Sequence, residues 1–272
     1  MKYCRFLLNE QIHYGAVEQH SGEAWITGPA PAPEEDLRFR LALGQAAAES
    51  FDFEPMPLSG AHLLPPVTPS KIVCVGRNYR DHVKELGNEV PLEPLIFLKP
   101  PSSLLSPADV VRLPAASTHV DFEGELVIVI GKRVHKLKAD ADLRGVIRGY
   151  TLADDISARD LQKKEPQWVR AKGHDTFCPM GPVVSDEVDP IAGVEIETQV
   201  NGEVRQHGST VDFIFSIPRL LSFISGAMTL EPGDVILTGT PSGVGPLKPG
   251  DQVEVSIAGI GTLTHSVEAG AD

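Results

Sequence analysis

Short apolar runs separated by glycine and proline make up most of this chain. Runs of this kind, bounded by turn residues, are typical of β-strands rather than of long helices. The first two and the last two runs lie close enough in sequence to form hairpins. The predicted strands cover residues 3–8, 12–17, 71–75, 95–98, 125–130, 194–200, 235–238, 253–257 and 261–267. With few helices beside them, they predict a β-rich fold of the α+β class.

Helical character is confined to a few segments. Asn78 is a candidate N-cap for a short helix that ends near Leu86. The longest predicted helix covers residues 212–228 and is entered through Ser209 and Thr210. Pro218 lies inside this pattern and predicts a kink, because proline lacks the backbone N–H that a helix interior needs. Residues 37–51 also have helical character.

The first 65 residues are expected to form a small domain of their own. The sequence LLPPVTP interrupts the chain near residues 65–69, so the predicted domains are 1–65 and 66–272. Within the first domain, residues 26–35 contain the sequence TGPAPAPEE and predict a loop.

Composition and charge exclude several classes of protein. The 272 residues contain 24 Lys and Arg against 37 Asp and Glu, which gives a net charge of −13. A nucleic-acid or anionic-lipid partner is therefore not expected, because both require a basic surface. Three cysteines without a CxxC pair exclude a disulfide framework and a thiolate zinc site. The chain has no apolar stretch of membrane-spanning length and no secretory leader pattern, so a cytoplasmic protein is expected.

Common catalytic signatures are missing from the chain. It contains no phosphate-binding GxxxxGK[ST], no GxSxG and no HExxH. A P-loop nucleotide site, a serine hydrolase elbow and a zincin site therefore have no support.

One strand carries an unusual row of polar residues. His119, Asp121, Glu123 and Glu125 are spaced two apart, so in a strand they share one face. Stacked carboxylates repel one another unless a cation neutralises them, and hard oxygen ligands favour Mg²⁺, Mn²⁺ or Ca²⁺. The alternative is a solvated strand face. The same face becomes apolar at residues 127 and 129, which favours a site at the end of a buried strand.

Two further polar clusters accompany this strand. Asp154 and Asp155 follow another apolar run and would supply a third carboxylate, although Asp and Arg also form structural ion pairs at turns. His82 and Glu85 are three residues apart and share one helix face, where the carboxylate would orient the imidazole as a base. The alternative for this pair is an ordinary surface contact.

Five blocks of sequence resemble the fumarylacetoacetate hydrolase family. They are residues 75–82 (VGRNYRDH), 97–101 (FLKPP), 122–126 (FEGEL), 155–160 (DISARD) and 231–245 (EPGDVILTGTPSGVG). The resemblance runs from about residue 69 to the C-terminus, and the first 65 residues look like the small N-terminal domain of prokaryotic-type members. It implies a mixed β-sandwich roll as the catalytic fold and a homodimer.

The resemblance also implies roles for individual residues. It implies a divalent metal held by Glu123, Glu125 and Asp155, with Asp154 the weaker candidate. It implies a His82–Glu85 dyad on a mobile helix that activates water, and Lys172 facing the substrate. Arg159, Gln162 and Thr240 match positions that hold the substrate carboxylate.

The function expected from this resemblance is a Mg²⁺-dependent hydrolase that cleaves a C–C bond in an acylpyruvate or another small keto acid, with Mn²⁺ or Ca²⁺ as alternative ions. The alternative is a decarboxylase, isomerase or tautomerase of oxaloacetate or an unsaturated keto-dicarboxylate, because the same enolate serves all of these reactions. A third alternative is a metal-binding relative without activity. The intact His82–Glu85 pair argues against it.

Overall fold

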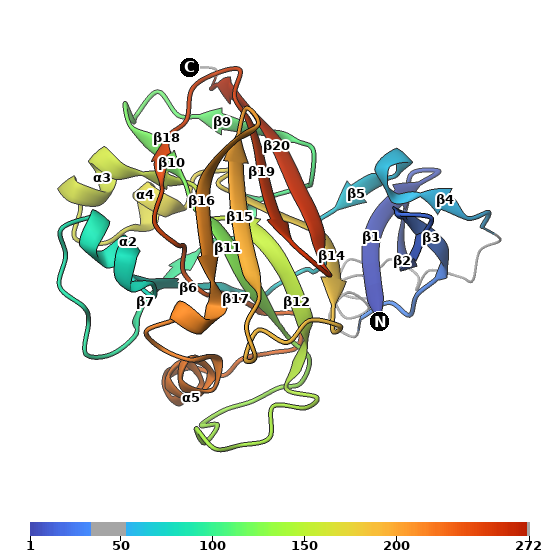
Figure 1. Cartoon of the computed structure of the whole chain (residues 1–272), viewed down its shortest axis with the longest axis horizontal. Coiled ribbons are helices and arrows are strands. Elements are labelled where there is room, and N and C mark those ends of the chain that lie inside the picture. The colour runs from blue at the N-terminus through green and yellow to red at the C-terminus, as the bar shows by residue number, and fades with distance from the viewer. Residues whose placement is uncertain (34–52, 271–272) are drawn as a thin grey trace.

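The computed structural model describes residues 1–33 and 53–270, and within them the strands form three sheets (Figure 1). The largest has the order β4-β3-β2-β1-β14-β12-β11-β17-β6-β7, with β5 paired to β1 and β8 paired to β14. Its strands are β1 (Lys2–Leu8), β2 (Gln11–His20), β3 (Glu23–Pro29), β4 (Met56–Pro57), β5 (His62–Leu64), β6 (Ile72–Gly76), β7 (Leu95–Lys99), β8 (Leu104–Leu105), β11 (Gly124–Ile130), β12 (Ile147–Asp154), β14 (Cys178–Ser185) and β17 (Val235–Leu237).

The second sheet has the order β16-β15-β19-β20-β9, and a small third sheet has the order β13-β10-β18. Most neighbours are antiparallel, but β17 and β6 pair in parallel, as do β20 and β9, so the sheets are mixed. The strands are β9 (Val110–Leu113), β15 (Glu195–Val200), β16 (Glu203–Ser209), β19 (Gln252–Ile257), β20 (Gly261–Ala269), β10 (Val120–Phe122), β13 (Ser157–Ala158) and β18 (Gly245–Pro246).

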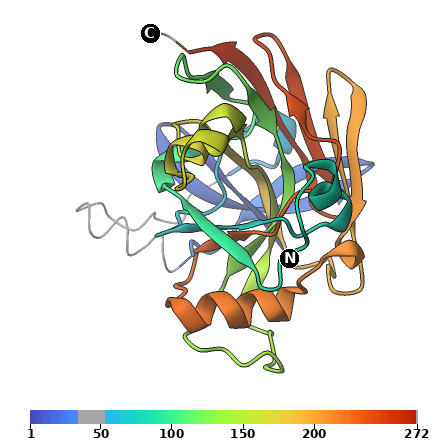
Figure 2. The same cartoon turned by 90° about the vertical axis from the view of Figure 1, so that its left-hand side faces the viewer.

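Helices are short and lie around the sheets. They are α2 (Arg80–Glu85), α3 (Arg159–Lys164), α4 (Val169–Lys172) and α5 (Ile217–Ala227), with single 3₁₀ turns η1 (Leu58–Gly60), η2 (Pro101–Ser103) and η3 (Thr210–Asp212). Figure 2 shows α5 as a separate layer at the end of the molecule opposite the C-terminus. The prediction of a β-rich α+β fold with mixed sheets is confirmed.

Strand β11 lies at the centre of the molecule, with every residue buried. Leu126, Ile128 and Ile130 point into the larger apolar cluster, which contains residues of the second sheet. Val127 and Val129 point to the opposite face, into a smaller cluster. The predicted change from acidic to apolar along one face of this strand is confirmed, and it places the acidic end of β11 at the edge of a dry core.

The N-terminal strands form an antiparallel ribbon at one side of the molecule (Figure 1). The predicted hairpin is confirmed as β1 and β2. Residues 26–29 continue β3 instead of starting a loop, because they pair with β2 and β4. The helix predicted for residues 37–51 lies outside the described residues. The ribbon joins the large sheet through pairing of β1 with β14, and the boundary near residue 65 stays a prediction.

Asn78 does not cap α2, which begins at Arg80 after Tyr79 without a side-chain cap. Its buried side chain instead donates to Thr238 O at 2.8 Å and accepts from Phe215 N at 2.8 Å. These bonds tie the start of α2 to segments more than 130 residues away in the sequence.

The same contacts explain why α5 starts at Ile217 and not at residue 212. Asn78 O accepts the N–H of Ile214, and Tyr79 forms a β-bridge with Phe213, so this stretch is held extended. Pro218 therefore lies in the first turn of α5, where a missing N–H is tolerated, and produces no kink. The terminal hairpin predicted for residues 253–267 is confirmed as β19 and β20.

Cys4, Cys74 and Cys178 are buried free thiols, in agreement with the predicted lack of disulfides. Burial raises the pKa of Cys178 to about 12, so this side chain is an inert part of the core. Over residues 1–33 and 53–270, no helix combines the length and apolar character needed to cross a bilayer. The homodimer stays a prediction.

Two glycines provide a matched test of the packing. A Cβ at Gly149 in β12 would lie 2.7 Å from Ser185 O on the neighbouring strand, whereas a Cβ at Gly226 in α5 meets nothing within 4 Å. We expect Gly149→Ala to lower the free energy of unfolding by about 1–3 kcal/mol through overpacking. Gly226→Ala should raise it by roughly 0.5–1 kcal/mol through helix propensity. Chemical denaturation of both variants checks this, and equal effects would contradict the register of β12 and β14.

Candidate active site

Three carboxylates converge where β11 and β12 meet. Glu123 precedes β11, Glu125 is its second residue and Asp155 directly follows β12. These strands are antiparallel with Gly124 opposite Asp154, and Asp155 N donates to Glu123 O at 2.8 Å. One carboxylate oxygen from each of the three residues lies within 4.8 Å of the others, and all three side chains are buried.

The residue between the two glutamates has to be glycine. A Cβ at Gly124 would lie 2.1 Å from Thr198 Oγ1 and 3.1 Å from Val255 Cγ1, both on the facing sheet. This close approach of the two sheets fixes the depth at which the glutamates sit. The glycine of the sequence EGE is therefore a packing requirement of the site.

Two buried lysines neutralise part of this charge. Lys172 is the last residue of α4, and its Nζ lies 2.6 Å from Glu123 Oε2 and 2.6 Å from Asp155 Oδ2. Lys99 ends β7, and its Nζ lies 2.6 Å from Asp155 Oδ1. Both lysine side chains are almost inaccessible to solvent, so these ion pairs are shielded from screening.

Arg159 at the start of α3 links further groups to the cluster. Its Nη2 lies 2.5 Å from Glu123 Oε1, its Nε lies 2.7 Å from Asp121 Oδ2, and its Nη1 donates to Gln162 Oε1 at 3.0 Å. Asp121 thus reaches the site only through Arg159. His119 contacts Asp121 but has a half-exposed side chain. Of the predicted row of four polar residues, only Glu123 and Glu125 therefore belong to the carboxylate cluster.

The pKa values of the two glutamates are shifted in opposite directions. Burial alone would raise both pKa values, because it penalises the charged form. The charges of Arg159 and Lys172 overcome this effect and hold the pKa of Glu123 well below its ordinary value. For Glu125, burial and the neighbouring charges of Asp155 and Glu123 act together and raise the pKa well above its ordinary value. Of the three carboxylates, Glu125 is the one whose negative charge is least balanced by a nearby cation.

Asp154 faces away from this cluster, although it is adjacent to Asp155. Its Oδ1 accepts the N–H of Glu123 at 2.6 Å, and its Oδ2 lies 2.8 Å from Nε2 of the buried His265. Asp154 therefore supports the backbone that positions Glu123. Sequence reasoning found no role for His265, whose partner lies more than a hundred residues away.

The predicted His–Glu pair is present on α2. His82 Nδ1 lies 3.1 Å from Glu85 Oε2, and the other oxygen of Glu85 accepts the N–H of Gly243 at 2.9 Å. His82 is buried, whereas about a third of the Glu85 side chain is exposed. Glu85 therefore connects α2 to the loop between β17 and β18.

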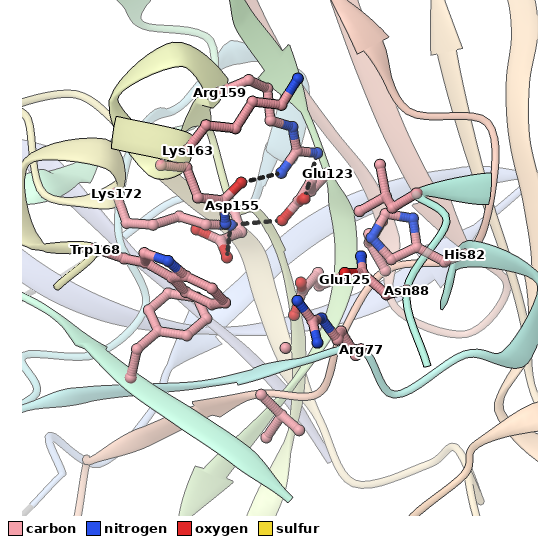
Figure 3. Close-up of a pocket in the computed structure, with 16 residues that line it drawn as sticks. Arg77, His82, Asn88, Glu123, Glu125, Asp155, Arg159, Lys163, Trp168 and Lys172 are labelled. Atoms are coloured by element: carbon pink, nitrogen blue, oxygen red, sulfur yellow. Dashed lines mark hydrogen bonds and ion pairs between the residues drawn. The ribbon is translucent and has the colours of Figure 1, made fainter. Parts of the chain in front are cut away.

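A cavity of about 350 Å³ joins these groups (Figure 3). Every predicted site residue except Glu85 lines it, and the carboxylates and His82 face one another across it. Its lining consists of Val75, Gly76, Arg77, His82, Leu86, Asn88, Phe97, Glu123, Glu125, Asp155, Arg159, Gln162, Lys163, Trp168, Lys172 and Thr240. The geometry brings these residues together, and their individual roles stay predictions.

Sequence reasoning gave no role to Arg77, Asn88, Lys163 or Trp168, and none to the buried Lys99. Arg77 and Lys99 lie within the blocks VGRNYRDH and FLKPP that resemble the family. Each of these two residues is a cation at the end of an apolar strand. That pattern indicates a functional role only once the acidic groups nearby are known.

The donor set fits a hard divalent cation. It consists of three buried carboxylates, and among the described residues Glu125 accepts a single hydrogen bond, from the N–H of Gly239 at 2.7 Å. A cation beside Glu125 would relieve the repulsion that raises its pKa. Oxygen ligands without imidazole or thiolate favour Mg²⁺ or Mn²⁺ over zinc.

A family model described as fumarylacetoacetate (FAA) hydrolase C-terminal matches residues 71–268. The chain therefore belongs to the FAA hydrolase family, whose members are metal-dependent enzymes, and it is an enzyme of that family. This confirms the resemblance found in the five sequence blocks.

Relatives with named activities are similar over most of the chain. Oxaloacetate decarboxylase of Dictyostelium discoideum is 47% identical over 204 residues, which cover 72% of this chain and 92% of the relative. Oxaloacetate tautomerase YisK of Bacillus subtilis is 44% identical over 212 residues, which cover 73% and 70%. The crystal structure of 2-hydroxyhepta-2,4-diene-1,7-dioate isomerase from Mycobacterium marinum is 40% identical, covers both chains completely and superposes with a TM-score of 0.84.

We predict from the raised pKa of Glu125 that metal binding depends on pH. Glu125 must lose its proton to become a ligand, so binding should release a proton, and affinity should rise with pH until Glu125 is ionised in the metal-free protein. Glu125→Gln should abolish this proton release. It should weaken binding by more than the roughly 10–100-fold that loss of an outer-shell partner costs.

Calorimetric titration with Mn²⁺ in buffers of different ionisation enthalpy measures both quantities. Glu89→Gln, a change at an exposed loop position, is the control. Equal affinity and proton release in the Glu125 and Glu89 variants would exclude Glu125 as a ligand.

Proposed function

We propose that this enzyme catalyses keto–enol tautomerisation of a short keto-dicarboxylate of the oxaloacetate type. The observation that carries the proposal is that the imidazole of His82 lines the same small cavity as three buried carboxylates suited to a divalent ion. One side of the cavity can thus accept developing negative charge, and the other side can exchange a proton.

The named relatives support this choice over C–C hydrolysis. They are an oxaloacetate decarboxylase, an oxaloacetate tautomerase and a heptadienedioate isomerase. The substrate in each name is a dicarboxylate, and none of the three names describes a hydrolase. The alternative reaction class considered from the sequence is therefore better supported than the hydrolysis first expected.

We propose Glu123, Glu125 and Asp155 as the residues that hold the ion, with Mg²⁺ as the native ion and Mn²⁺ as a substitute. When bound, the ion would supply electrophilic stabilisation of negative charge on a keto oxygen. Lys172 contacts two of these carboxylates, so it helps to fix their orientation and adds positive charge at the same side of the cavity.

The protein's own proton carrier in this proposal is His82. In tautomerisation, the imidazole takes a proton from the carbon beside the keto group, the electron pair of that C–H bond forms the C=C bond, and the imidazolium then gives a proton to the enolate oxygen. Glu85 accepts the N–H of Nδ1 and leaves Nε2 as the base. The tautomer follows from this hydrogen bond.

A carboxylate of the substrate needs donors of its own. Arg159 and Gln162 line the cavity beside Glu123. Thr240 lines it too. Its hydroxyl donates to Gly124 O at 2.9 Å and accepts from Gln206 Nε2 at 2.7 Å, so it has to turn away from Gly124 O in order to donate to a substrate carboxylate. We propose these three side chains as the contacts of the carboxylate next to the keto group.

Decarboxylation is the second candidate, because one relative is named for it. In that reaction the bond from the carbon beside the keto group to the remote carboxylate breaks, CO₂ leaves, and the electron pair of that bond forms the enolate of pyruvate, which is then protonated on carbon. The step that forms the enolate needs no base. The two reactions therefore differ in how strongly they depend on His82.

A small substrate panel distinguishes these reactions. With Mg²⁺ or Mn²⁺ present, we expect fast loss of the ultraviolet absorbance of enol oxaloacetate, and slower release of pyruvate from oxaloacetate. Cleavage of acetylpyruvate to acetate and pyruvate should be slowest. Rapid acetylpyruvate cleavage without any turnover of oxaloacetate would restore the hydrolase assignment.

The dyad gives a second test. His82→Ala and Glu85→Ala should each lower kcat for tautomerisation by about 10²–10⁴-fold, because general base catalysis is lost. Affinity for Mn²⁺ should be retained, because neither residue belongs to the carboxylate cluster. Lys84→Ala, an exposed change on the same helix, is the control. A tautomerisation rate equal to that of the parent in the double alanine variant would remove the dyad from the mechanism.

A further inference from the structure

Arg77 lines the cavity and, unlike Arg159 and Lys172, has no acidic partner among the described residues. Arg159, Lys172 and the adjacent Lys99 all form short ion pairs with the carboxylate cluster. Arg77 lines the cavity but makes no hydrogen bond or ion pair in the part of the chain that the structure describes. Its guanidinium is thus available for an anionic ligand.

The backbone at Arg77 is in a conformation that favours glycine. Its φ angle is +59°, in the left-handed region that non-glycine residues seldom adopt. Both neighbours hold it there. Gly76 pairs with Leu95 across β6 and β7, and Asn78 is anchored by its bonds to Thr238 and Phe215. This fixed backbone gives the Arg77 side chain a defined starting point at the cavity wall.

The summed charge of the site, a divalent ion and a dicarboxylate substrate is balanced only when one further cation is present. Asp121, Glu123, Glu125 and Asp155 carry four negative charges when ionised, and Arg159, Lys172 and Lys99 carry three positive charges. A divalent ion turns this deficit of one into a surplus of one, which matches one carboxylate of a substrate. A second substrate carboxylate would need a further cation.

We infer that Arg77 binds the second, remote carboxylate of a keto-dicarboxylate and selects diacids over keto acids with one carboxylate. This inference rests on the proposed function and assigns the selectivity for dicarboxylate substrates to one residue. The planar guanidinium can donate two parallel N–H bonds to a carboxylate, which adds geometric selectivity to the charge.

Lys163 is a second cation on the cavity wall that forms no ion pair or hydrogen bond with any residue the structure describes. Figure 3 places it at the end of the pocket opposite Arg77, beyond Arg159. Its side chain belongs to an exposed position of α3, where water screens the charge. Arg77 is half-buried and lies on the side of His82, so it is the stronger partner for the arm of the substrate that reacts.

The test compares ligands with and without the remote carboxylate. Malate retains both carboxylates and does not tautomerise, whereas oxalate has no arm that extends beyond the metal site. On Mn²⁺-loaded protein, Arg77→Gln should weaken malate binding by about 10–100-fold, as expected for a lost charge-assisted hydrogen bond. Oxalate and Mn²⁺ affinities should stay unchanged. Arg77→Lys should restore part of the malate affinity because it keeps the charge.

Arg80→Gln is the matched control, because it removes a cation three residues away that does not line the cavity. In kinetics, Arg77→Gln should lower kcat/KM for oxaloacetate about 10–100-fold relative to acetylpyruvate. Equal malate affinities in the Arg77→Gln and Arg80→Gln variants would overturn the inference, as would a loss of malate affinity in Lys163→Gln alone.

The two proposals fail separately. If the parent enzyme turns over oxaloacetate while Arg77→Gln keeps its preference for the diacid, the role of Arg77 is wrong and the proposed function stands. If the parent enzyme leaves oxaloacetate unchanged but malate binding still depends on Arg77, the carboxylate site stands and the proposed reaction is wrong. Circular dichroism of each variant verifies that a loss of binding is not a loss of fold.

Discussion

The mutual repulsion of three buried carboxylates is the constraint on which the rest of this structure depends. Glu123, Glu125 and Asp155 lie at the ends of two central strands, away from the solvent that would otherwise screen them. Lys172 from α4 and Lys99 from β7 partly neutralise this charge. The compensation is unequal, so Glu125 is left as the group that gains most from an added cation.

The sequence predicted the parts of this site that depend on local pattern. The two-residue spacing of Glu123 and Glu125 and the apolar residues that follow indicated an acidic end on a buried strand, which the burial of β11 bears out. The contacts of Asn78 could not be predicted in this way. Its side chain satisfies backbone groups that approach it only in the folded chain, and local capping rules do not include them.

The start of α5 illustrates the same limit. Helical propensity extends back to residue 212, but Asp212 ends the separate turn η3 and Phe213 pairs with Tyr79, so tertiary contacts override the local preference. The reaction was also beyond the reach of pattern. Hydrolysis, decarboxylation and tautomerisation can all proceed through a metal-stabilised enolate, so family and fold do not choose among these reactions.

Glu85 has a further consequence, because its two oxygens hold different parts of the molecule. One contacts His82, and the other accepts the N–H of Gly243 in the loop that also carries Thr240. Movement of α2 away from this loop would break the second bond and leave the carboxylate free to turn toward water. The imidazole would then lose its fixed orientation at the moment when the cavity opens. The orientation of the His82 imidazole and the position of α2 against this loop thus depend on the same side chain.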